Sequence, residues 1–387
     1  MNKLSSIADY VTDKISSNDI SLSEYVTTDC ILQNKKGREV ASNLPPQPCC
    51  LTRYQRGDIL IANIRPYLKK VWFADIDGGA SSDVLVFRAK EGHSPSFLYA
   101  VLLQDSFFDY VMQGAKGSKM PRGDKEQILR YEMPILSCSE ESIGTFFLNL
   151  DQKIRLNEQI NQNLEAMAKQ LYDYWFVQFD FPNEEGKTYK SSGEVMVYNE
   201  RLRREIPQGW STMPISEILD KYPTTKRYET KEYLSCGKYP IIDQGDSYIV
   251  GFTNEVDHLL TRHPAVLFGD HSTKVKFLDF EFARGADGTQ ILYSSSEAVS
   301  QYYLYLAVSA LQIPNPGYSR HFKYLKELPI IIPDLKIANK FKNIVKPLFE
   351  EWTKNIFCNI ELTKQRNELL PLLMNGQVSV NSDLSLG

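Results

Sequence analysis

Two short basic loops hold the side chains best suited to binding an anion. The first, 111–123 (VMQGAKGSKMPRG), has no acid and presents Lys116, Lys119 and Arg122 among three glycines. The second, 313–326 (IPNPGYSRHFKYLK), is also free of acids and presents Tyr318, Arg320 and Lys323. Lys and Arg neutralise phosphates, and an Arg paired with guanine O6 and N7 gives ~1–3 kcal/mol of discrimination. One such loop would more simply be solvated, but the pair favours contact with DNA.

A second pair of segments offers further polar side chains. NIRPYLKK (63–70) and DHSTKVK (270–276) follow apolar runs, and their candidate DNA ligands are Arg65, Tyr67, Lys69, His271 and Lys274. Side chains alternate between the two faces of a strand, so some of these must point into the domain. A role in packing within the domain is as compatible with this pattern as a role in binding DNA.

Signals of catalysis are weak. The chain has no phosphate-binding GxxxxGK[ST] loop and no His/Cys/Asp cluster with metal-ligand spacing. Asn-Pro-Gly-Tyr at 315–318 differs by one residue from the NPPY tetrad of amino-methyltransferases. No glycine motif for a cofactor precedes it, so we expect a turn. The carboxylates do not form a nuclease-like PD…(D/E)xK pattern. We therefore predict no catalytic residue, no metal site and no cofactor in this chain.

Composition limits the protein class. The 387 residues are too many for one ordinary core, and 42% hydrophobic with 24% charged residues is typical of a globular protein. The net charge of −4 does not by itself suggest DNA, so any contact must come from local basic patches. Six cysteines without a CxxC pair, and the absence of a signal peptide or membrane span, predict a reduced cytoplasmic protein without membrane association.

The segments that position these residues form an internal repeat. The run at 59–73 matches 265–279, 206 positions later, and 79–87 matches 285–293 at the same spacing. The sequence of each copy predicts the same order of elements. A short first helix (4–15 or 215–219) is followed by strands, a second helix (97–112 or 300–311), the basic loop and a long helix. Each copy is therefore expected to be an α+β domain followed by a helical spacer.

The two long helices carry apolar residues at alternating steps of three and four, the pattern of a coiled coil. The predicted interface of the helix pair consists of Leu150, Ile154, Asn157, Asn161, Leu164 and Leu171 with Leu348, Trp352, Asn355, Asn359, Leu362 and Leu369. The asparagines recur 198 positions apart, and a buried asparagine fixes register at a cost in stability. This pattern predicts that Asn157 and Asn161 face Asn355 and Asn359 in an antiparallel pair; two unrelated amphipathic helices are the alternative.

Three motifs resemble one known family. LNEQINQNLEAMAKQLYDYWFVQFDFPNEEGKTYKSSGEVMVYNE (156–200), IPQGW (206–210) and LTKQRNELLPLLMNGQVSV (362–380) are similar to segments of specificity (S) subunits of type I restriction–modification systems. The resemblance covers the whole chain in order. It is specific for the helical and linker parts and looser between them.

The resemblance implies an architecture. It would place target-recognition domains at 1–140 and 207–334, spacer helices at 141–178 and 335–380, and a linker at 179–206. The fold class is then α+β, with two repeated target-recognition domains separated by two long antiparallel helices that form a pseudo-twofold coiled coil.

The resemblance also implies a function. A non-catalytic subunit of this kind selects a bipartite sequence in double-stranded DNA and binds two methyltransferase (M) subunits on its helical regions. Those subunits bring S-adenosylmethionine and flip the target adenine, and restriction (R) subunits bring ATP and Mg. The alternatives are a stand-alone DNA methyltransferase or nuclease, which would bind S-adenosylmethionine or cut DNA, and a protein-binding tether, which would lack salt-dependent DNA affinity.

Overall fold

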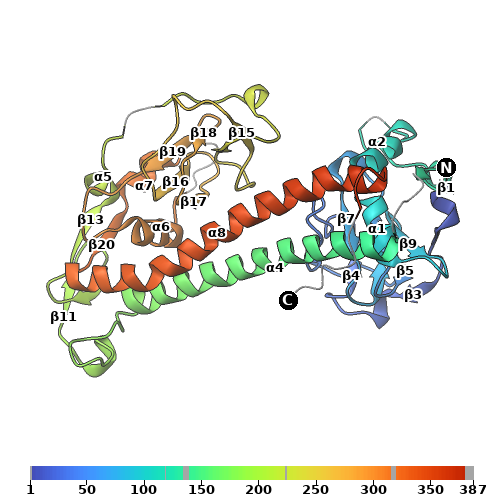
Figure 1. Ribbon diagram of the computed structural model, residues 1–387. Coiled ribbons are helices and arrows are strands. Elements are labelled where there is room, and N and C mark those ends of the chain that lie inside the picture. Colours follow the sequence, from blue (N-terminus) through green and yellow to red (C-terminus); the bar gives the residue numbers. More distant parts are fainter. Residues whose placement is uncertain (1, 118, 134–138, 223–224, 315–319, 380–387) are drawn as a thin grey trace. The chain divides into compact units, whose positions relative to one another are not determined.

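The computed structural model describes residues 2–117, 119–133, 139–222, 225–314 and 320–379 (Figure 1). The chain divides into two compact units, Met1–Glu158 with Cys358–Gly387, and Gln159–Phe357. Each unit consists of one α+β domain and one stretch of each long helix. The predicted fold class, repeated α+β domains with two long antiparallel helices, is confirmed.

The first unit contains two four-stranded sheets. One has the order β2 (Ala8–Tyr10), β9 (Val84–Ala89), β6 (Ile59–Ala62) and β7 (Val71–Phe73). The other has the order β3 (Lys14–Ser16), β5 (Cys50–Tyr54), β8 (Gly78–Ala80) and β4 (Tyr25–Val26). The remaining elements are β1 (Asn2–Lys3) paired with β10 (Glu132–Met133), and the helices α1 (Pro95–Leu102), α2 (Asp105–Gln113) and α3 (Lys125–Ile128). Every residue of β6 is buried, as expected for a central strand.

The second unit is built from smaller sheets. Two have three strands: β15 (Gly251–Thr253), β14 (Tyr239–Ile242) and β18 (Ala283–Arg284); and β17 (Val275–Leu278), β16 (Ala265–Gly269) and β19 (Thr289–Leu292). Two have two strands: β13 (Ser211–Pro214) with β20 (Pro329–Ile332), and β11 (Met196–Asn199) with β12 (Arg204–Pro207). The short helices are α5 (Ile215–Ile218), α6 (Gln301–Ala310) and α7 (Phe322–Glu327).

The repeat extends to the register of the central strands. In the first unit Leu60 of β6 lies opposite Val86 of β9. In the second unit Val266 of β16 lies opposite Leu292 of β19, and both residues are 206 positions after their counterparts. The loops at the ends of these strands are therefore equivalent in the two units.

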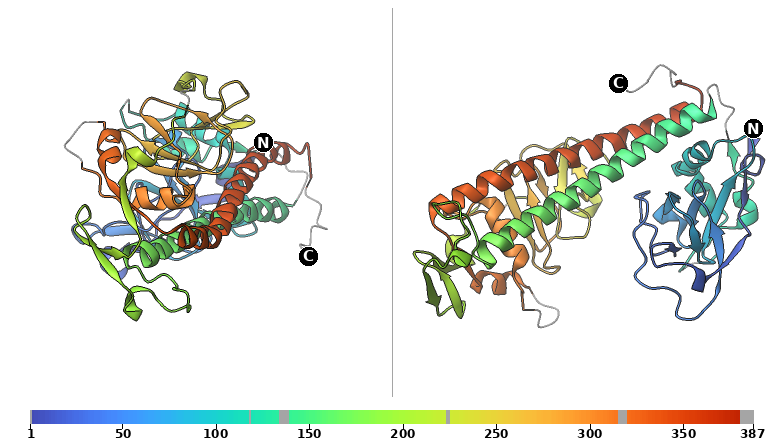
Figure 2. Two further views of the ribbon diagram at one scale, coloured as in Figure 1. Left: turned by 90° about the vertical axis from the view of Figure 1, so that its left-hand side faces the viewer. Right: turned by 90° about the horizontal axis from the view of Figure 1, so that it is seen from below.

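The long helices extend over nearly the ranges that their periodicity predicts. α4 spans Glu140–Tyr172 and continues into a π-helical turn at Asp173–Val177, and α8 spans Leu335–Met374. In both units a stretch of α4 lies beside a stretch of α8 (Figure 2). The direction is antiparallel in each unit. In the first unit Asp151 and Asn157 contact Arg366 and Asn359, and in the second unit Asn161 and Trp175 contact Asn355 and Phe341, so the residue numbers fall along one helix as they rise along the other.

Each domain shares its apolar core with its stretch of the helices. In the first unit α1 packs with Ile143 and Phe147 of α4 and with Leu370 and Leu373 of α8. In the second unit the ring of Phe349 in α8 lies 4.4 Å from that of Phe277 in β17. The helices therefore pack against the domains as well as against each other.

Three segments differ from the expected local structure. The single helix expected over 97–112 is two helices, α1 and α2, with Leu103 and Gln104 between them. The helix predicted over 4–15 is wrong: this segment forms a single 3-10 turn at Leu4–Ser6 followed by β2 and β3. The segment expected to be a surface linker, 179–206, contains the hairpin of β11 and β12, and Phe181 stacks on Trp210 with ring centroids 4.9 Å apart. Part of that segment thus belongs to the core of the second unit.

Candidate nucleic-acid interface

Three loops of the first unit meet at the end of the central strand β6. Asn63 follows β6, and its backbone N–H donates to the carbonyl of Asp83 at 2.9 Å. The Asn63 carbonyl in turn accepts from the backbone N–H of Gly123 at 3.3 Å. The loops at 63–69, 81–83 and 116–123 are therefore joined by main-chain hydrogen bonds, although they are distant in sequence. We call this group of loops the first loop surface.

The basic loop is a closed turn. The backbone groups of Lys116 and Arg122 exchange two hydrogen bonds of 2.9 Å, and the N–H of Arg65 donates to the carbonyl of Pro121 at 2.8 Å. A Cβ at Gly123 would lie 2.7 Å from Val111 Cγ1, so only glycine fits this close approach. The structure thus brings together 63–70 and 111–123, which the sequence offered as separate candidate segments.

The predicted DNA ligands of the first unit differ in how exposed they are and in whether they already pair with an acid. The Arg65 and Lys119 side chains are exposed, and Tyr67 is 50% exposed. Arg122 is exposed and pairs with Asp83 at 3.1 Å. Lys116 is exposed and pairs with Asp124 at 2.9 Å, and this contact holds the pKa of the Asp124 carboxyl below its usual value.

Lys69 has a different environment. Its ammonium and that of the buried Lys35 both bind the Asp105 carboxylate of α2, each at 2.8 Å. The backbone N–H of Lys35 also donates to the Lys69 carbonyl at 2.9 Å. Lys69 therefore braces the turn after β6 against α2, and in this arrangement its charge is already neutralised.

The second unit has an equivalent meeting of loops at the end of β16. The backbone N–H of Asp270 donates to the Gly288 carbonyl at 2.7 Å, and the N–H of His321 donates to the Asp270 carbonyl at 2.8 Å. The carboxylate of Asp270 accepts from the N–H of Phe322 at 2.8 Å, and both Asp270 and His321 are buried. These buried groups fix the loops that follow β16, precede β19 and lead into α7. We call these loops, with 243–247, the second loop surface.

The predicted ligands of the second unit lie on this surface or beside it. His271 is exposed, and its backbone N–H donates to Gln244 Oε1 at 2.9 Å. Lys274 is exposed and pairs with Asp246. Arg320 and Lys323 are exposed, and the Lys323 ammonium lies 4.6 Å from the centre of the Tyr324 ring. Tyr318, and with it the expected turn at 315–318, lies outside the described residues.

The loop at 243–247 belongs to this surface, although the sequence did not indicate it. The Nζ of the buried Lys276 donates to the carbonyls of Asp243 and Ser247, at 2.7 and 2.6 Å, and burial lowers the pKa of Lys276 to about 8. Gln244 Nε2 donates to the Asp287 carbonyl at 2.7 Å. Lys276 is thus an internal clamp that holds a polar loop beside His271.

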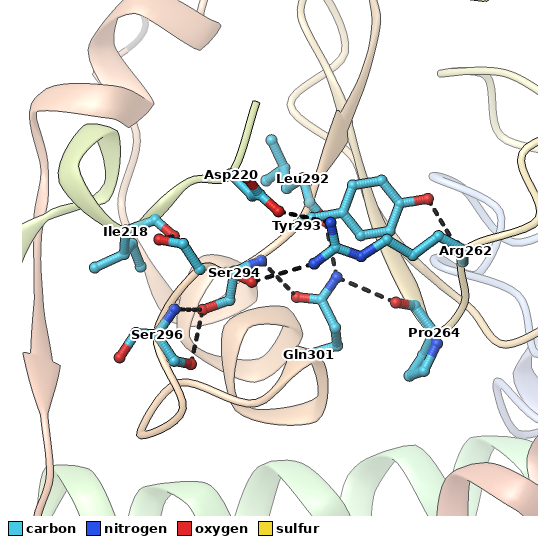
Figure 3. Close-up of polar contacts among 10 residues, drawn as sticks. Ile218, Asp220, Arg262, Pro264, Leu292, Tyr293, Ser294, Ser296 and Gln301 are labelled. Carbon is cyan, nitrogen blue, oxygen red and sulfur yellow. Dashed lines mark hydrogen bonds and ion pairs between the residues drawn. The ribbon is translucent and has the colours of Figure 1, made fainter. Parts of the chain in front are cut away.

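A separate polar network closes the other ends of β16 and β19, away from the second loop surface, as Figure 3 shows. Gln301, at the start of α6, donates from Nε2 to the carbonyls of Pro264 and Leu292 at 3.1 and 3.0 Å. Its Oε1 accepts from the backbone N–H of Ser294 at 3.0 Å. Since Pro264 precedes β16 and Leu292 ends β19, this one side chain ties both strands to α6 at the end remote from the loop surface.

Charged contacts reinforce these remote ends. In the second unit the Arg262 guanidinium lies 4.4 Å from the centre of the Tyr293 ring and binds Asp220 at 2.6 Å (Figure 3). In the first unit the buried Asp58, just before β6, accepts two hydrogen bonds from Arg88 at 2.8 and 2.7 Å. The strands are thus anchored at one end, and the loops at the other end are held on a rigid support.

The four asparagines of the helix pair, which we call the seam asparagines, form reciprocal contacts within each unit. In the first unit Asn157 Nδ2 donates to Asn359 Oδ1 at 2.8 Å, and Asn359 Nδ2 donates to the Ile154 carbonyl at 3.1 Å. In the second unit Asn355 Nδ2 donates to Asn161 Oδ1 at 2.9 Å, and Asn161 Nδ2 donates to the Trp352 carbonyl at 3.2 Å. Each pair is thus joined by one amide–amide hydrogen bond, and Asn359 and Asn161 also donate to the backbone of the opposite helix.

Among the asparagines, Asn157, Asn161 and Asn355 are buried and Asn359 is half-buried, whereas most of the other predicted interface residues are half-buried. Leu150, Leu164, Leu171, Leu348, Trp352, Leu362 and Leu369 are half-buried, and Ile154 is buried. On α8 the most buried apolar side chains include Val345, Phe349 and Leu370. The reason is that α8 turns a second apolar face towards the domains, a face that a heptad pattern for two helices does not include.

A buried ion network in the first unit was also missed. Asp151 of α4 is 2% exposed and binds Arg366 of α8 at 3.0 Å. The same carboxylate accepts from the Tyr99 hydroxyl of α1 at 2.7 Å and from Arg155 Nε at 3.1 Å. The signal was the charged Arg366 at an apolar seam position, which requires a buried acid opposite it.

The described residues of the two loop surfaces offer hydrogen-bonding groups and cations. Among all the residues that the structure describes, no group of three His, Cys, Asp or Glu side chains is arranged to hold a metal ion. Nor does this part of the chain contain a helix long and apolar enough to cross a membrane. The exposed cations and amides of the two loop surfaces can bind phosphates and base edges.

Comparisons with known proteins agree on one family. Residues 207–368 match the family model of the type I restriction modification DNA specificity domain. The type I restriction enzyme MjaIX specificity subunit of Methanocaldococcus jannaschii is 25% identical over 363 residues, which are 86% of this chain and 80% of that protein. The HindI specificity subunit of Haemophilus influenzae is 30% identical over 167 residues, 40% of this chain and 36% of that protein.

A solved structure has the same fold. The S subunit of the type I restriction–modification system from M. genitalium aligns with 96% of this chain and 95% of its own, with a TM-score of 0.60 and 15% sequence identity.

Proposed function

The chain belongs to the specificity subunits of type I restriction–modification systems, and from this premise we propose that it selects a bipartite DNA sequence. Each unit binds one half of that sequence through its own loop surface. The chain has no catalytic centre of its own. Two methyltransferase subunits supply S-adenosylmethionine and the chemistry on the flipped base, and restriction subunits, where present, supply ATP-driven cleavage with Mg.

The observation that carries this proposal is the repetition of the loop surface. At the end of a fully buried central strand, each unit joins loops that are distant in sequence and exposes cations from them, Arg65 and Arg122 in one unit and Lys274 and Arg320 in the other. Cations on such loops bind the DNA backbone, and an Arg can also bind a base edge. Two such surfaces in one chain match a target of two separate halves.

The proposed docking of methyltransferase subunits on the helical regions has support in the second unit. Near the end of α4, Met167 is 50% exposed. In the π-helical turn that continues the helix, Tyr174 is 37% exposed and Val177 is 42% exposed. Exposed apolar side chains on one helix face are typical of a surface that a partner protein covers.

The test is methylome mapping of a host that carries this chain with its methyltransferase partner. We expect one bipartite motif whose two halves change independently when the loops of one unit are exchanged. A motif in one continuous piece, or methylation that does not depend on this chain, would contradict the proposal.

Two further measurements separate the alternatives. The purified chain should neither methylate nor cut DNA. Turnover that is lost when a carboxylate of this chain is replaced would favour a stand-alone enzyme. Phosphate contacts make DNA affinity fall steeply between 50 and 200 mM salt. An affinity that does not change over this range would favour a protein-binding tether.

A further inference from the structure

In each unit an aspartate beside the loop surface holds an exposed arginine. Asp83 lies between β8 and β9 and binds Arg122 at 3.1 Å, with side-chain exposures of 39% and 57%. Asp287 lies between β18 and β19 and binds Arg227, with exposures of 75% and 49%. The loops that carry the two aspartates precede equivalent strands, β9 and β19. The two aspartates therefore stand at equivalent places in the fold, whereas their arginines come from different segments, the loop between α2 and α3 in the first unit and the segment after α5 in the second.

Neither carboxylate is needed to shape its loop. The contact that joins Asp83 to the first loop surface is made by its backbone carbonyl, which accepts from the N–H of Asn63 at 2.9 Å. The backbone carbonyl of Asp287 likewise accepts from Gln244 Nε2 at 2.7 Å. Asp124 is a useful contrast, because its carboxylate also caps α3 by accepting from the N–H groups of Glu126 and Gln127. The Asp83 and Asp287 side chains thus have the arginines as their main described contacts.

We propose that Asp83 and Asp287 set the DNA specificity of the two units by competing with phosphate for Arg122 and Arg227. The inference rests on the proposed function. An exposed ion pair shifts an equilibrium by no more than about fivefold, so DNA can open it. A phosphate met on random DNA must displace a carboxylate of the same charge and gains little. A guanine edge that accepts two hydrogen bonds discriminates by about five- to a hundredfold, which exceeds the cost of opening the pair.

The carboxylate also acts directly on the DNA backbone. Once displaced, it remains beside the loop surface and repels any phosphate that is not held in place by matching base contacts. Repulsion of the wrong partner is a common source of specificity. Random DNA is bound almost wholly through phosphates. The carboxylates should therefore weaken random binding more than target binding.

The test compares full-length variants by fluorescence anisotropy with a random-sequence duplex and with a target duplex identified by methylome mapping. Asp83→Asn and Asp287→Asn should each raise affinity for the random duplex by about two- to fivefold. Each should also make the slope of log K against log salt steeper by up to about 0.9, the value for one more phosphate contact. Affinity for the target should rise less, so the ratio of target to random affinity falls.

Matched controls separate this effect from net charge. Asp19→Asn in the first unit and Glu217→Gln in the second remove one exposed carboxylate each, at residues that belong to none of the loops of the two surfaces, and should leave the affinity ratio at the parent value. Asp83→Glu keeps the charge and should also keep the parent ratio. Equal random-DNA affinities for Asp83→Asn and Asp19→Asn, and for Asp287→Asn and Glu217→Gln, would overturn the inference. If the parent itself shows no salt-dependent DNA binding, the proposed function fails before this question arises.

Discussion

Replacing Asp151 with Asn should destabilise the first unit far more than the loss of one surface ion pair would. The Arg366 guanidinium is 6% exposed and binds Asp151 at 3.0 Å. Its other described hydrogen bond, to Asn367 Oδ1, is long at 3.4 Å. Without the carboxylate, a buried cation is left nearly uncompensated, and breaking a buried pair in this way typically costs ~3–5 kcal/mol.

The opposite substitution should cost less. In Arg366→Met the Asp151 carboxylate keeps the Tyr99 hydroxyl at 2.7 Å and Arg155 Nε at 3.1 Å. Burial raises the pKa of Tyr99, so its hydroxyl remains a donor. The double variant Asp151→Asn with Arg366→Met removes these two charges and leaves an amide oxygen to accept from Tyr99 and Arg155. The Arg155 guanidinium is 23% exposed, so water can compensate its charge where it could not compensate that of Arg366. Since a buried ion pair can often be replaced by neutral groups without loss, the double variant should recover at least ~2 kcal/mol of the cost of Asp151→Asn.

The assay must report on the first unit. Trp72 is the single tryptophan of that unit and is buried. The ¹⁹F resonance of 5-fluorotryptophan at this position, followed through a urea titration, gives the free energy of unfolding of the first unit. Glu126→Gln is the control, because Glu126 and Arg130 of the same unit form an exposed pair at 3.6 Å that is worth less than ~1 kcal/mol. A cost below ~1 kcal/mol for Asp151→Asn, or simple addition of the two single costs in the double variant, would refute the argument.

Three other predictions follow from the loops and helices. Arg122→Ala or Arg320→Ala should weaken recognition of one half-site only. A lost guanine contact costs ~1–3 kcal/mol and relaxes one base position, whereas a lost phosphate contact lowers affinity for all sequences evenly and reduces the salt slope by about one. Binding assays that show neither effect would exclude these residues as DNA ligands. Replacing Asn157 and the other three seam asparagines with Leu should raise the melting temperature but allow slipped pairings of the two helices. Slipped pairings are detectable by cysteine cross-linking between the helices. A lower melting temperature with a single register would contradict this prediction. The pKa of Lys276 falls from 10.5 to about 8 on folding. Between these pH values the unfolded chain binds more protons than the folded chain, so the free energy of unfolding should rise with pH across that window by up to about 3 kcal/mol. Lys276→Met should lose this rise in urea titrations, and an unchanged pH profile would count against the role of Lys276 as a clamp.

The long helices and the repeat were predictable because their signals are local or repeated. A continuous three-four periodicity and paired asparagines identify α4 and α8 without any tertiary information. The segment at 4–15 shows the limit of the same method. Ile7, Val11 and Ile15 are spaced four apart, as on a helix face. In the structure the N–H of Val11 instead donates to the Val86 carbonyl at 2.9 Å, because pairing with β9 satisfies the backbone and buries the segment in a sheet.

The loop surfaces show a subtler limit, which concerns charge. The two basic loops stood out because no acid lies within them in the sequence, yet the structure places acids beside cations of the first loop and of the other candidate segment, 270–276. Asp83 reaches Arg122 from the loop before β9, and Asp124, just after the turn, reaches Lys116. In the second unit Asp246 reaches Lys274 from another loop.

The charge that DNA meets is therefore set by topology, since the strands decide which loops become neighbours. This also accounts for a DNA-binding chain with a net charge of −4. Part of its acid lies against the cations of its own loop surfaces, where each ion pair is exposed and weak enough for a matching target to displace. A local excess of Lys and Arg in the sequence indicates where DNA can bind, and the carboxylates brought beside it decide how readily random DNA is accepted there.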